Sequence, residues 1–261
     1  MQDKKVRDAY NAYFHFNNER TLSTDLASEL FSVESEGCSV FVDKTRKYDN
    51  QIIIHELSSI ETLESYLSFY TRDLPPEISV EPQAITNELT TWLLNRAFVS
   101  EYEHEFLELK PDEYVACTDK SQQVSVEQWS HDNVDDFLAL LKTSGLECSN
   151  EIWQKKRPLY CTERFRCYVA KINGEPCAWA TSYIEGEYVI LANAYTQESY
   201  RSKGCQTALL RARIEDAISL GSKVVLTDVM PNSTSSRNCK LVGFRHVGVR
   251  SVWCKNRDSH C

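Results

Sequence analysis

Apolar and polar residues alternate with two different periods in the first half of the chain, which predicts a mixture of helices and strands. Apolar residues three and four positions apart indicate helices, and continuous or alternating apolar runs indicate strands. Ser58 and Glu61 are predicted to form a capping box at the start of the second helix. The predicted helices cover 6–16, 58–70 and 85–96, and the predicted strands cover 51–55, 77–82 and 99–109.

The second half has a clearer pattern, dominated by three strands in succession. Asn173-Gly174 is the dipeptide that type I′ hairpin turns prefer, and Gly186 indicates a second turn. Strands joined by such turns predict an antiparallel meander. An amphipathic helix follows, and Gly221 is well placed as its C-cap. The predicted strands are 166–172, 176–184, 188–195, 223–229 and 244–253, and the predicted helices are around 137–141, 204–220 and 233–241.

A polar stretch from Lys110 to Gln123 is the best candidate for a boundary between the two halves. It follows one apolar strand and precedes the next ordered segment. We therefore expect an α/β (α+β) protein with domains at residues 1–118 and 119–261.

The charge and composition exclude several classes of function. The 261 residues carry a formal net charge of -9 and the sequence pI is about 5.3, so nucleic-acid binding has no electrostatic support. No apolar run approaches the roughly 18 residues of a membrane span, and the N-terminus has no apolar signal region. We expect a soluble, cytoplasmic protein that does not bind membranes.

Ten cysteines are scattered over the whole chain without a Cys-x-x-Cys pair. None has histidine partners at the spacing of a zinc site. In the absence of a secretory signal, free thiols in a reducing compartment are the expected state. We predict neither a disulfide framework nor a bound metal.

The segment from Arg201 to Thr207 carries the most informative chemistry. It lies between a predicted strand and the amphipathic helix, and Gly204 allows the backbone to approach a ligand closely. The free N–H groups of the first helical turn attract anions, and Arg201 and Lys203 add positive charge. The segment therefore predicts a pyrophosphate cradle, although an ordinary basic helix start is an alternative. It has neither the Gly-Lys-Ser/Thr of a P-loop nor the Gly-x-Gly-x-x-Gly of a Rossmann turn.

In this context the sequence resembles the GNAT superfamily of N-acetyltransferases. The cradle is similar to the family's Arg/Gln-x-x-Gly-x-Gly/Ala signature, and VGFRHVGV, with Gly243-Phe244, is similar to its closing motif. The resemblance covers about residues 124 to 254. It implies a mixed, mostly antiparallel sheet flanked by helices, with acetyl-CoA as cosubstrate. It also implies transfer of an acetyl group to a primary amine of an unidentified small molecule or peptide.

The resemblance further implies where the cosubstrate binds. The end of the third meander strand would pair with the pantetheine arm, the cradle would hold the pyrophosphate, and polar residues near the last short helix would lie beside the thioester. These polar residues are equally suited to helix capping, which stays an alternative. The implied binding residues are Ala194, Tyr195, Thr196, Arg201, Ser202, Lys203, Gly204, Cys205, Gln206, Thr207, Asn232, Ser235 and Asn238.

Two positions depart from the family pattern. Gln206 stands where the signature has its last Gly or Ala, so its side chain must leave the cradle sideways. Cys239 stands where many members have the tyrosine that protonates the departing thiolate; it is a candidate acid or a small buried packing residue. Asp228 is the candidate base for the amine, with Glu185 and Glu187 as alternatives. Each of these three residues is alternatively a solvent-exposed charge in a turn or at a strand edge, without a catalytic role.

The first half has the order of helices and strands that is expected of a degenerate repeat of the second half. Ala97-Phe98 matches Gly243-Phe244, but no glycine or basic residue stands between the strand at 51–55 and the next helix. We therefore expect a degenerate GNAT-like half that cannot bind coenzyme A and instead completes the sheet or walls the acceptor cleft. A non-catalytic acyl-CoA sensor and a purely structural module remain alternatives to an enzyme, and the oligomeric state is left open.

Overall fold

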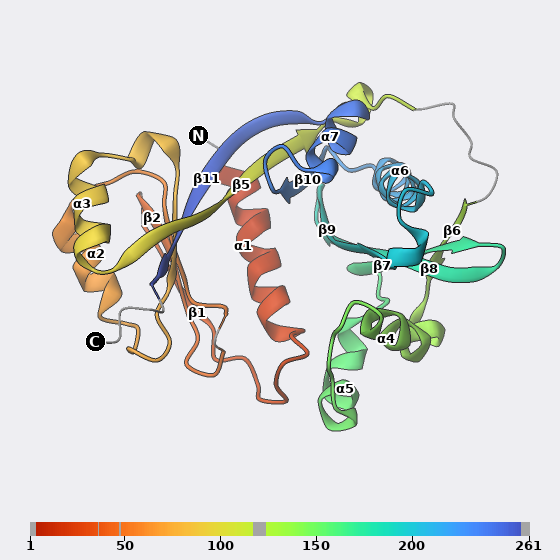
Figure 1. Cartoon of the computed structure of the whole chain (residues 1–261), viewed down its shortest axis with the longest axis horizontal. Helices are drawn as coiled ribbons and strands as arrows, with labels where there is room; N and C mark the ends of the chain where they lie inside the picture. Colours follow the sequence, from red (N-terminus) through yellow and green to blue (C-terminus); the bar gives the residue numbers. More distant parts are fainter. Residues whose placement is uncertain (1–3, 36, 47, 117–123, 257–261) are drawn as a thin grey trace.

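Eleven strands form one continuous sheet in the computed structural model, which describes residues 4–35, 37–46, 48–116 and 124–256 (Figure 1). Their order across the sheet is β1-β2-β3-β4-β11-β5-β10-β9-β8-β7-β6. The strands are β1 (Phe31–Glu34), β2 (Cys38–Val42), β3 (Gln51–Ile54), β4 (Glu77–Val80), β5 (Phe98–Leu109), β6 (Val124–Trp129), β7 (Phe165–Ile172), β8 (Glu175–Glu185), β9 (Tyr188–Thr196), β10 (Val224–Val229) and β11 (Arg245–Lys255). The helices are α1 (Lys4–Glu19), α2 (Ile60–Leu67), α3 (Asn87–Asn95), α4 (Val134–Lys142), α5 (Asn150–Lys156), α6 (Cys205–Ser219) and α7 (Thr234–Leu241).

The predicted meander is confirmed. Asn173 and Gly174 have φ angles of 53° and 85°, as a type I′ turn requires, and they join β7 to β8. Gly186 joins β8 to β9, and both strand pairs are antiparallel. This meander carries β9 to the centre of the sheet, next to the parallel strand β10.

Some elements differ from the sequence-based prediction. The strands β1, β2 and β6 and the helix α5 were not predicted. The N-cap of α2 is Ser59 rather than Ser58, because the Ser59 hydroxyl accepts a hydrogen bond from the amide of Thr62. The proposed domain boundary between 118 and 119 lies outside the described residues.

The two halves of the chain exchange strands. β11, from the second half, lies between β4 and β5 of the first half and pairs antiparallel with both. β5 in turn pairs with β10, with Thr227 opposite Leu107. Ala97 and Gly243, which precede β5 and β11, both have positive φ angles, of 56° and 108°. Each half therefore turns its final strand into the sheet of the other half in a similar way.

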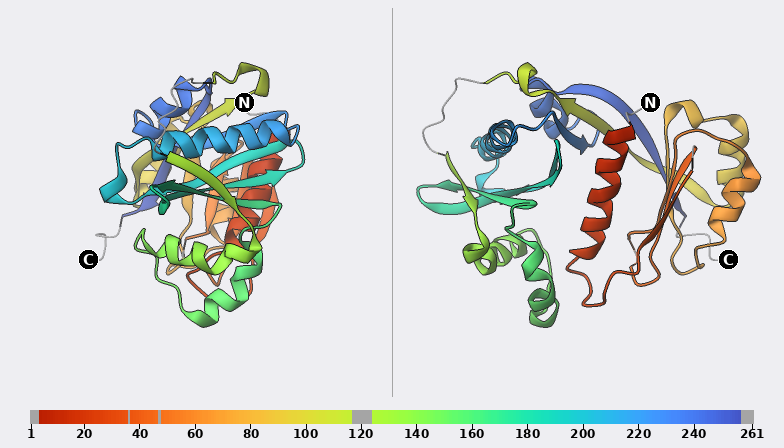
Figure 2. Two further views of the ribbon diagram at one scale, coloured as in Figure 1. Left: turned by 90° about the vertical axis from the view of Figure 1, so that its right-hand side faces the viewer. Right: turned by 180° about the vertical axis from the view of Figure 1, so that it is seen from behind.

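Helices cover both faces of the sheet (Figures 1 and 2). α6 and α7 pack on one face of β9 and β10, while α4 and α5 pack on the opposite face of β7 and β8. α2 and α3 cover the strands of the first half. α1 joins the halves, since Phe16 contacts the ring of Tyr183 at 5.0 Å between centroids and Phe14 contacts Phe41 at 4.3 Å. No helix in the described part of the chain is long and apolar enough to cross a membrane.

The sheet opens between β9 and β10. These strands pair only as far as Leu226 opposite Ile190, after which the Thr227 hydroxyl donates to the carbonyl of Leu191 at 3.0 Å. Beyond this point β10 follows β5 and β9 follows β8, where β9 carries one extra residue between its partners Ala180 and Ser182. The bulge and the diverging partners leave a gap between two parallel strands.

The corresponding parallel strands of the first half stay closed. β3 and β4 pair over four residues each, and the amide of Glu81 continues the ladder by donating to Ile54 at 3.0 Å. His55 Nδ1 then lies 2.8 Å from Glu81 Oε1, and both side chains are buried. The same strand arrangement is therefore open in one half and sealed in the other.

Candidate active site

The cradle loop ends in a left-handed backbone that opens helix α6. Gly204 is the N-cap with φ 85°, and Ser202 is also left-handed with φ 61°. The first helical hydrogen bond runs from the amide of Ala208 to the carbonyl of Gly204. The amides of residues 205–207 therefore have no acceptor within the helix and present the positive end of its dipole. This geometry suits an anionic ligand.

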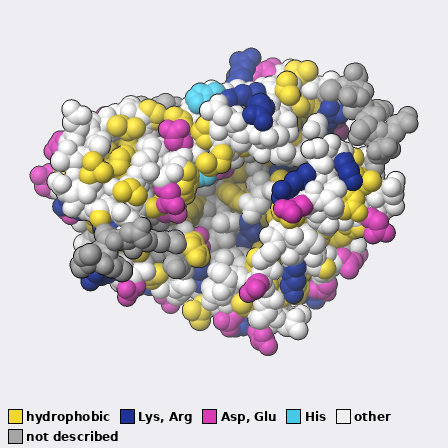
Figure 3. All heavy atoms as spheres, viewed as in Figure 1, with side chains coloured by type: hydrophobic (Ala, Val, Ile, Leu, Met, Phe, Trp, Pro, Cys, Tyr) yellow, Lys and Arg dark blue, Asp and Glu magenta, His cyan; other side chains and the backbone are white. Residues whose placement is uncertain are grey.

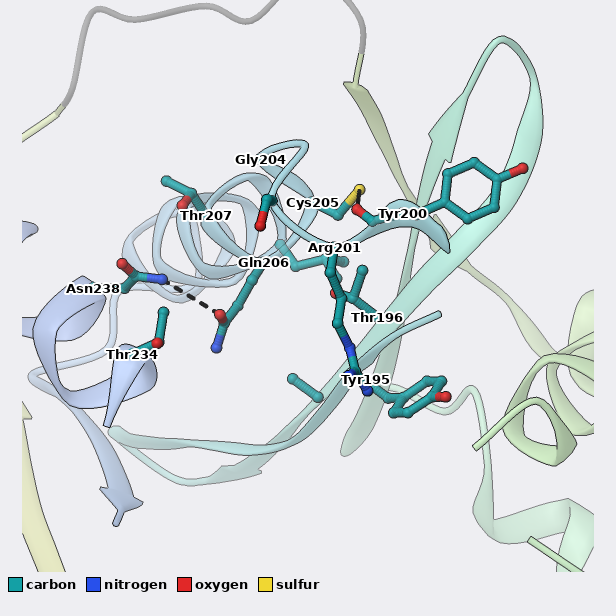
Figure 4. Close-up of a pocket in the computed structure, with 13 residues that line it drawn as sticks. Tyr195, Thr196, Tyr200, Arg201, Gly204, Cys205, Gln206, Thr207, Thr234 and Asn238 are labelled. Carbon is teal, nitrogen blue, oxygen red and sulfur yellow. Dashed lines mark hydrogen bonds between the residues drawn. The ribbon is translucent and has the colours of Figure 1, made fainter. Parts of the chain in front are cut away.

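A cavity of about 470 Å³ lies in front of these amides (Figure 4). The structure brings most of the predicted binding residues together here. Arg201 extends along the cavity and is 58% exposed, with Nη1 3.4 Å from Glu198 Oε1. Lys203 does not line the cavity, because its Nζ lies over the Tyr200 ring, 5.0 Å from the centroid. The lining residues are Ala194, Tyr195, Thr196, Tyr200, Arg201, Ser202, Gly204, Cys205, Gln206, Thr207, Leu209, Thr234 and Asn238.

The Gln206 side chain does leave the cradle sideways. Its Nε2 donates to Ser235 Oγ at 2.7 Å, and its Oε1 accepts from Asn238 Nδ2 at 3.4 Å (Figure 4). Gln206 thus links α6 to α7 at the edge of the cavity. The position that departs from the signature serves as a brace and does not block the amides.

The end of β9 offers a free backbone edge to this cavity. Ala194, Tyr195 and Thr196 pair with β8 on one side, but β10 has already separated on the other. The N–H and C=O groups on that side of the strand face the gap, where an extended ligand can add almost as another strand. The segment from Ala194 to Thr196 therefore has room to pair with a pantetheine arm, as expected from the sequence.

A second cavity, of about 510 Å³, occupies the gap between β9 and β10. It shares Ala194, Gln206 and Asn238 with the first, so the two cavities adjoin at these residues. Its opposite wall is formed by α1, through Tyr13 and Asn17. The remaining lining residues are Leu191, Ala192, Asn193, Leu210, Arg213, Thr227, Asp228, Val229, Met230, Ser233, Ser235 and Cys239.

Asp228 lines this second cavity from β10, and its Oδ2 lies 3.0 Å from Nδ1 of His104 on β5. The other two carboxylates considered from the sequence lie elsewhere. Glu185 pairs with Arg164 at the β8–β9 turn, and Glu187 pairs with Lys223 at 2.8 Å. Neither lines either cavity. Of these three carboxylates, Asp228 is the one that lines the gap between β9 and β10.

Cys239 also lines the second cavity, but it is only 5% exposed. Burial raises the pKa of its thiol to about 11, with the Arg213 guanidinium opposing the shift and Glu105 adding to it. A thiol with this pKa transfers its proton to a thiolate less readily than an ordinary thiol does. The structure thus favours packing over acid catalysis for Cys239.

The polar residues near α7 divide between the two cavities. Asn238 lines both, whereas Ser235 lines only the second. Asn232 lines neither; it is exposed, with φ 59°, and its carbonyl accepts a hydrogen bond from Arg237 at 2.8 Å. Its geometry is that of a turn before the helix.

Several residues that border the second cavity were not singled out from the sequence. Tyr13 and Asn17 come from a helix nearly two hundred residues away from the cradle, and no local pattern connects them to it. Arg213 had a readable signal, because it lies within the apolar stripe of α6 next to Leu210 and Ile214. A charged residue on a buried stripe is a reason to suspect a function.

Residues 126–244 match the sequence profile of the acetyltransferase (GNAT) family. This match identifies a GNAT acetyltransferase domain at residues 126–244. This domain contains the cradle, the gap between β9 and β10, and α7. No curated protein sequence matches the chain.

Solved structures share the fold of nearly the whole chain, beyond the GNAT domain itself. A GCN5-related N-acetyltransferase from Kribbella flavida has a TM-score of 0.66 at 12% identity, over 95% of this chain and 93% of that one. A conserved protein of unknown function from Staphylococcus epidermidis has a TM-score of 0.64 at 12% identity, over 89% and 96%. A GCN5-related N-acetyltransferase from Sphaerobacter thermophilus has a TM-score of 0.59 at 11% identity, over 84% and 80%. These similarities establish the fold of both halves.

The described residues contain no group of three or more His, Cys, Asp or Glu side chains arranged to hold a metal ion. The cysteine nearest the cradle amides, Cys205, instead lies 3.6 Å from Cys177, sulfur to sulfur, and both are buried. The polar and charged groups that line the two cavities are the candidates for a chemical role at this site.

Proposed function

We propose that the protein is an acetyl-CoA-dependent N-acetyltransferase that acetylates a primary amine of a small molecule or peptide. The adjacency of the two cavities at the gap between β9 and β10 carries this proposal. The anion cradle borders one cavity, and Asp228 and α1 border the other. Two adjoining cavities of this kind can hold a long cosubstrate in one and an acceptor in the other.

The cradle fits the pyrophosphate of coenzyme A. The amides of residues 205–207 and Arg201 supply hydrogen bonds and positive charge, and the free edge of β9 from Ala194 to Thr196 can pair with the amides of the pantetheine arm. Lys203 is exposed and can swing toward a phosphate from its place over Tyr200. Bound acetyl-CoA would supply the acetyl thioester.

Asp228 is the proposed base for the acceptor amine. An alkylammonium ion must lose a proton before its nitrogen attacks a thioester. Asp228 lines the gap, with its carboxylate 3.0 Å from His104 Nδ1, so it can receive this proton and keep the amine oriented. Positioning the amine against the thioester then provides much of the rate enhancement.

The first half of the chain supports this site without carrying a cradle of its own. Tyr13, Asn17 and His104 all come from residues before 118 and border or brace the acceptor side. The closed pairing of β3 with β4 and the acidic first turn of α2 leave no anion site there. We therefore propose that residues 1–118 are a degenerate GNAT-like domain that walls the acceptor cleft of the domain at 119–261. The free thiols fit the proposed cytoplasmic location.

The test is release of the coenzyme A thiol from acetyl-CoA, measured with a panel of primary amines. We expect release above the hydrolysis rate for at least one amine, with mass spectrometry showing an acetylated product. Calorimetric binding of acetyl-CoA provides the companion measurement.

A non-catalytic acyl-CoA sensor is the second candidate. The buried thiol of Cys239, whose pKa is raised to about 11, favours it, because no good proton donor stands at the usual position. Tight acetyl-CoA binding with no release above hydrolysis, across amines of varied charge and size, would exclude the enzyme and support the sensor.

A further inference from the structure

Arg213 is a buried cation at the wall of the second cavity. It projects from the middle of α6 and is only 5% exposed. In the described part of the chain it forms no ion pair with a carboxylate, whereas the buried Arg250 pairs with Glu81 at 3.1 Å. Burial lowers the pKa of the Arg213 guanidinium to about 10, so it stays protonated at neutral pH. An unpaired buried charge is costly, so proteins usually retain one where it has a function.

The hydrogen bonds of Arg213 use only part of its donor capacity. Nε donates to the carbonyl of Leu209 at 3.2 Å, and Nη1 donates to the carbonyl of Thr181 at 3.1 Å. Thr181 lies opposite the bulge of β9, so the second bond anchors the guanidinium at the level of the gap. A guanidinium has five N–H groups, and the other three have no protein acceptor among the described residues. The cavity is where these groups can meet a ligand.

A negative charge arises in this cavity during the proposed reaction. The amine nitrogen bonds to the acetyl carbon, the carbon–sulfur bond breaks, and its electron pair stays on the sulfur as a thiolate. An alkylammonium acceptor gives up two protons in all, one to Asp228 before the attack and one from the new amide nitrogen as the carbon–sulfur bond breaks. Asp228 releases the first proton to solvent and can then receive the second. Cys239, the thiol at the usual donor position, is buried beside Arg213 and holds its own proton tightly.

We propose that Arg213 stabilises the departing coenzyme A thiolate as an ion pair, so that the thiolate need not be protonated on the enzyme. This inference rests on the proposed function. The titratable and charged groups around it are Cys239 from α7, Tyr168 from β7 and Asp228 from β10. Arg213 is the positively charged member of this group, so its charge determines how strongly the gap stabilises a thiolate.

The pKa of the thiol of bound coenzyme A tests the inference without an acceptor. Thiolate absorbance is followed against pH for the full-length protein with free coenzyme A. The complex with desulfo-coenzyme A, which lacks the thiol, serves as the baseline that cancels the protein's own cysteines. We expect the bound thiol to have a pKa lower than in solution by about 1 to 2, as next to an opposite charge.

Two variants separate charge from structure. Arg213→Gln keeps a donor for the Thr181 carbonyl but loses the charge, so the bound thiol should return to its solution pKa or above. Arg213→Lys keeps the charge and should retain most of the lowering. Unchanged affinity of both variants for desulfo-coenzyme A shows that the cradle is intact.

A solution-like thiol pKa in the parent protein, or the same lowered pKa in Arg213→Gln, would overturn the inference. If the lowered pKa depends on Arg213 but no amine is acetylated, the thiolate site stands and the proposed enzyme activity fails. If amines are acetylated and the pKa is not lowered, the activity stands and the role of Arg213 is wrong.

Discussion

At the residue scale, the cradle depends on a backbone conformation and not on a particular side chain. Gly204 has φ 85°, which side chains with a Cβ rarely adopt, and it directly precedes the free amides of α6. Arg201 is exposed and forms an ion pair with Glu198, so it adds charge without defining the shape of the cradle. The glycine is therefore the residue whose replacement should matter most for anion binding.

We predict that Gly204→Glu weakens acetyl-CoA binding by at least about 100-fold while the protein stays folded, since it adds strain and places a carboxylate at the anion site. Isothermal calorimetry measures the affinity, and circular dichroism checks the fold. Gly204→Asn is the matched control, because asparagine tolerates the left-handed conformation and carries no charge. Unchanged affinity in Gly204→Glu would refute the cradle.

Replacement of Cys239 and replacement of Asp228 should have different effects on kcat. If Cys239 mainly packs under α7, Cys239→Ala should lower kcat less than about 10-fold, whereas Asp228→Asn removes a proton acceptor and should lower it about 100-fold or more. Steady-state kinetics with an acceptor amine measures both. A loss of 100-fold or more in Cys239→Ala would restore the acid role that the position suggests.

At the element scale, the sequence predicted the long, strongly patterned elements and missed those at the margins. The meander and α6 have tight-turn dipeptides or a full apolar stripe, which are local signals. β1 and β6 lie at the two edges of the sheet and have no buried residue, so their patterns resemble loops. β2 is fully buried over five residues and was missed, although the equally short strand at 51–55 was predicted.

The same contrast applies to the site. The cradle is contiguous in sequence, so its glycine and basic residues could be found directly. Asp228 and His104 meet only because β10 pairs with β5, and strand pairing between distant segments leaves no local pattern. The raised pKa of Cys239 follows from burial, which the family position of that residue does not reveal.

The closed pairing of β3 with β4 in the first half leads to a prediction about how stability depends on pH. Burial alone would raise the pKa of Glu81, but hydrogen bonds and charge from its partners His55 and Arg250 outweigh this effect and lower the pKa to about 2 from an ordinary 4.5. Folding therefore favours the ionised form. Its contribution, on the order of 3 kcal/mol, is present above about pH 4.5 and is lost as the pH falls toward 2.

We expect Glu81→Gln to lower the free energy of unfolding at pH 7 and to flatten its dependence on pH between about 5 and 2. Urea denaturation across this range measures both effects. Glu61, on the exposed surface of α2, provides the comparison, and Glu61→Gln should change stability far less. An equally steep acid transition in Glu81→Gln would contradict the assignment.

At the scale of the whole molecule, the exchanged strands make the halves interdependent. β11 is flanked by β4 and β5, and β10 has β5 as its outer neighbour, so the GNAT domain borrows a strand from residues before 118. α1 adds a second link through the packing of Phe16 on Tyr183 and its place in the cavity wall. The space-filling view shows the molecule hollowed between the two halves, so the joint between them also shapes the cleft (Figure 3).

This interdependence predicts how fragments behave. Residues 124–261 produced alone would expose the β10 edge and leave β11 without β4 and β5, so this fragment should aggregate or lack a cooperative melting transition. Produced together with residues 1–116, it should form a one-to-one complex that recovers acetyl-CoA binding, because every strand then regains its neighbours. Size-exclusion chromatography with light scattering and calorimetry measure assembly and binding. If 124–261 is instead a stable monomer that binds acetyl-CoA as tightly as the whole chain, the first half is dispensable for the fold of the site. Its role would then be limited to the acceptor side, where Tyr13 and Asn17 form the wall.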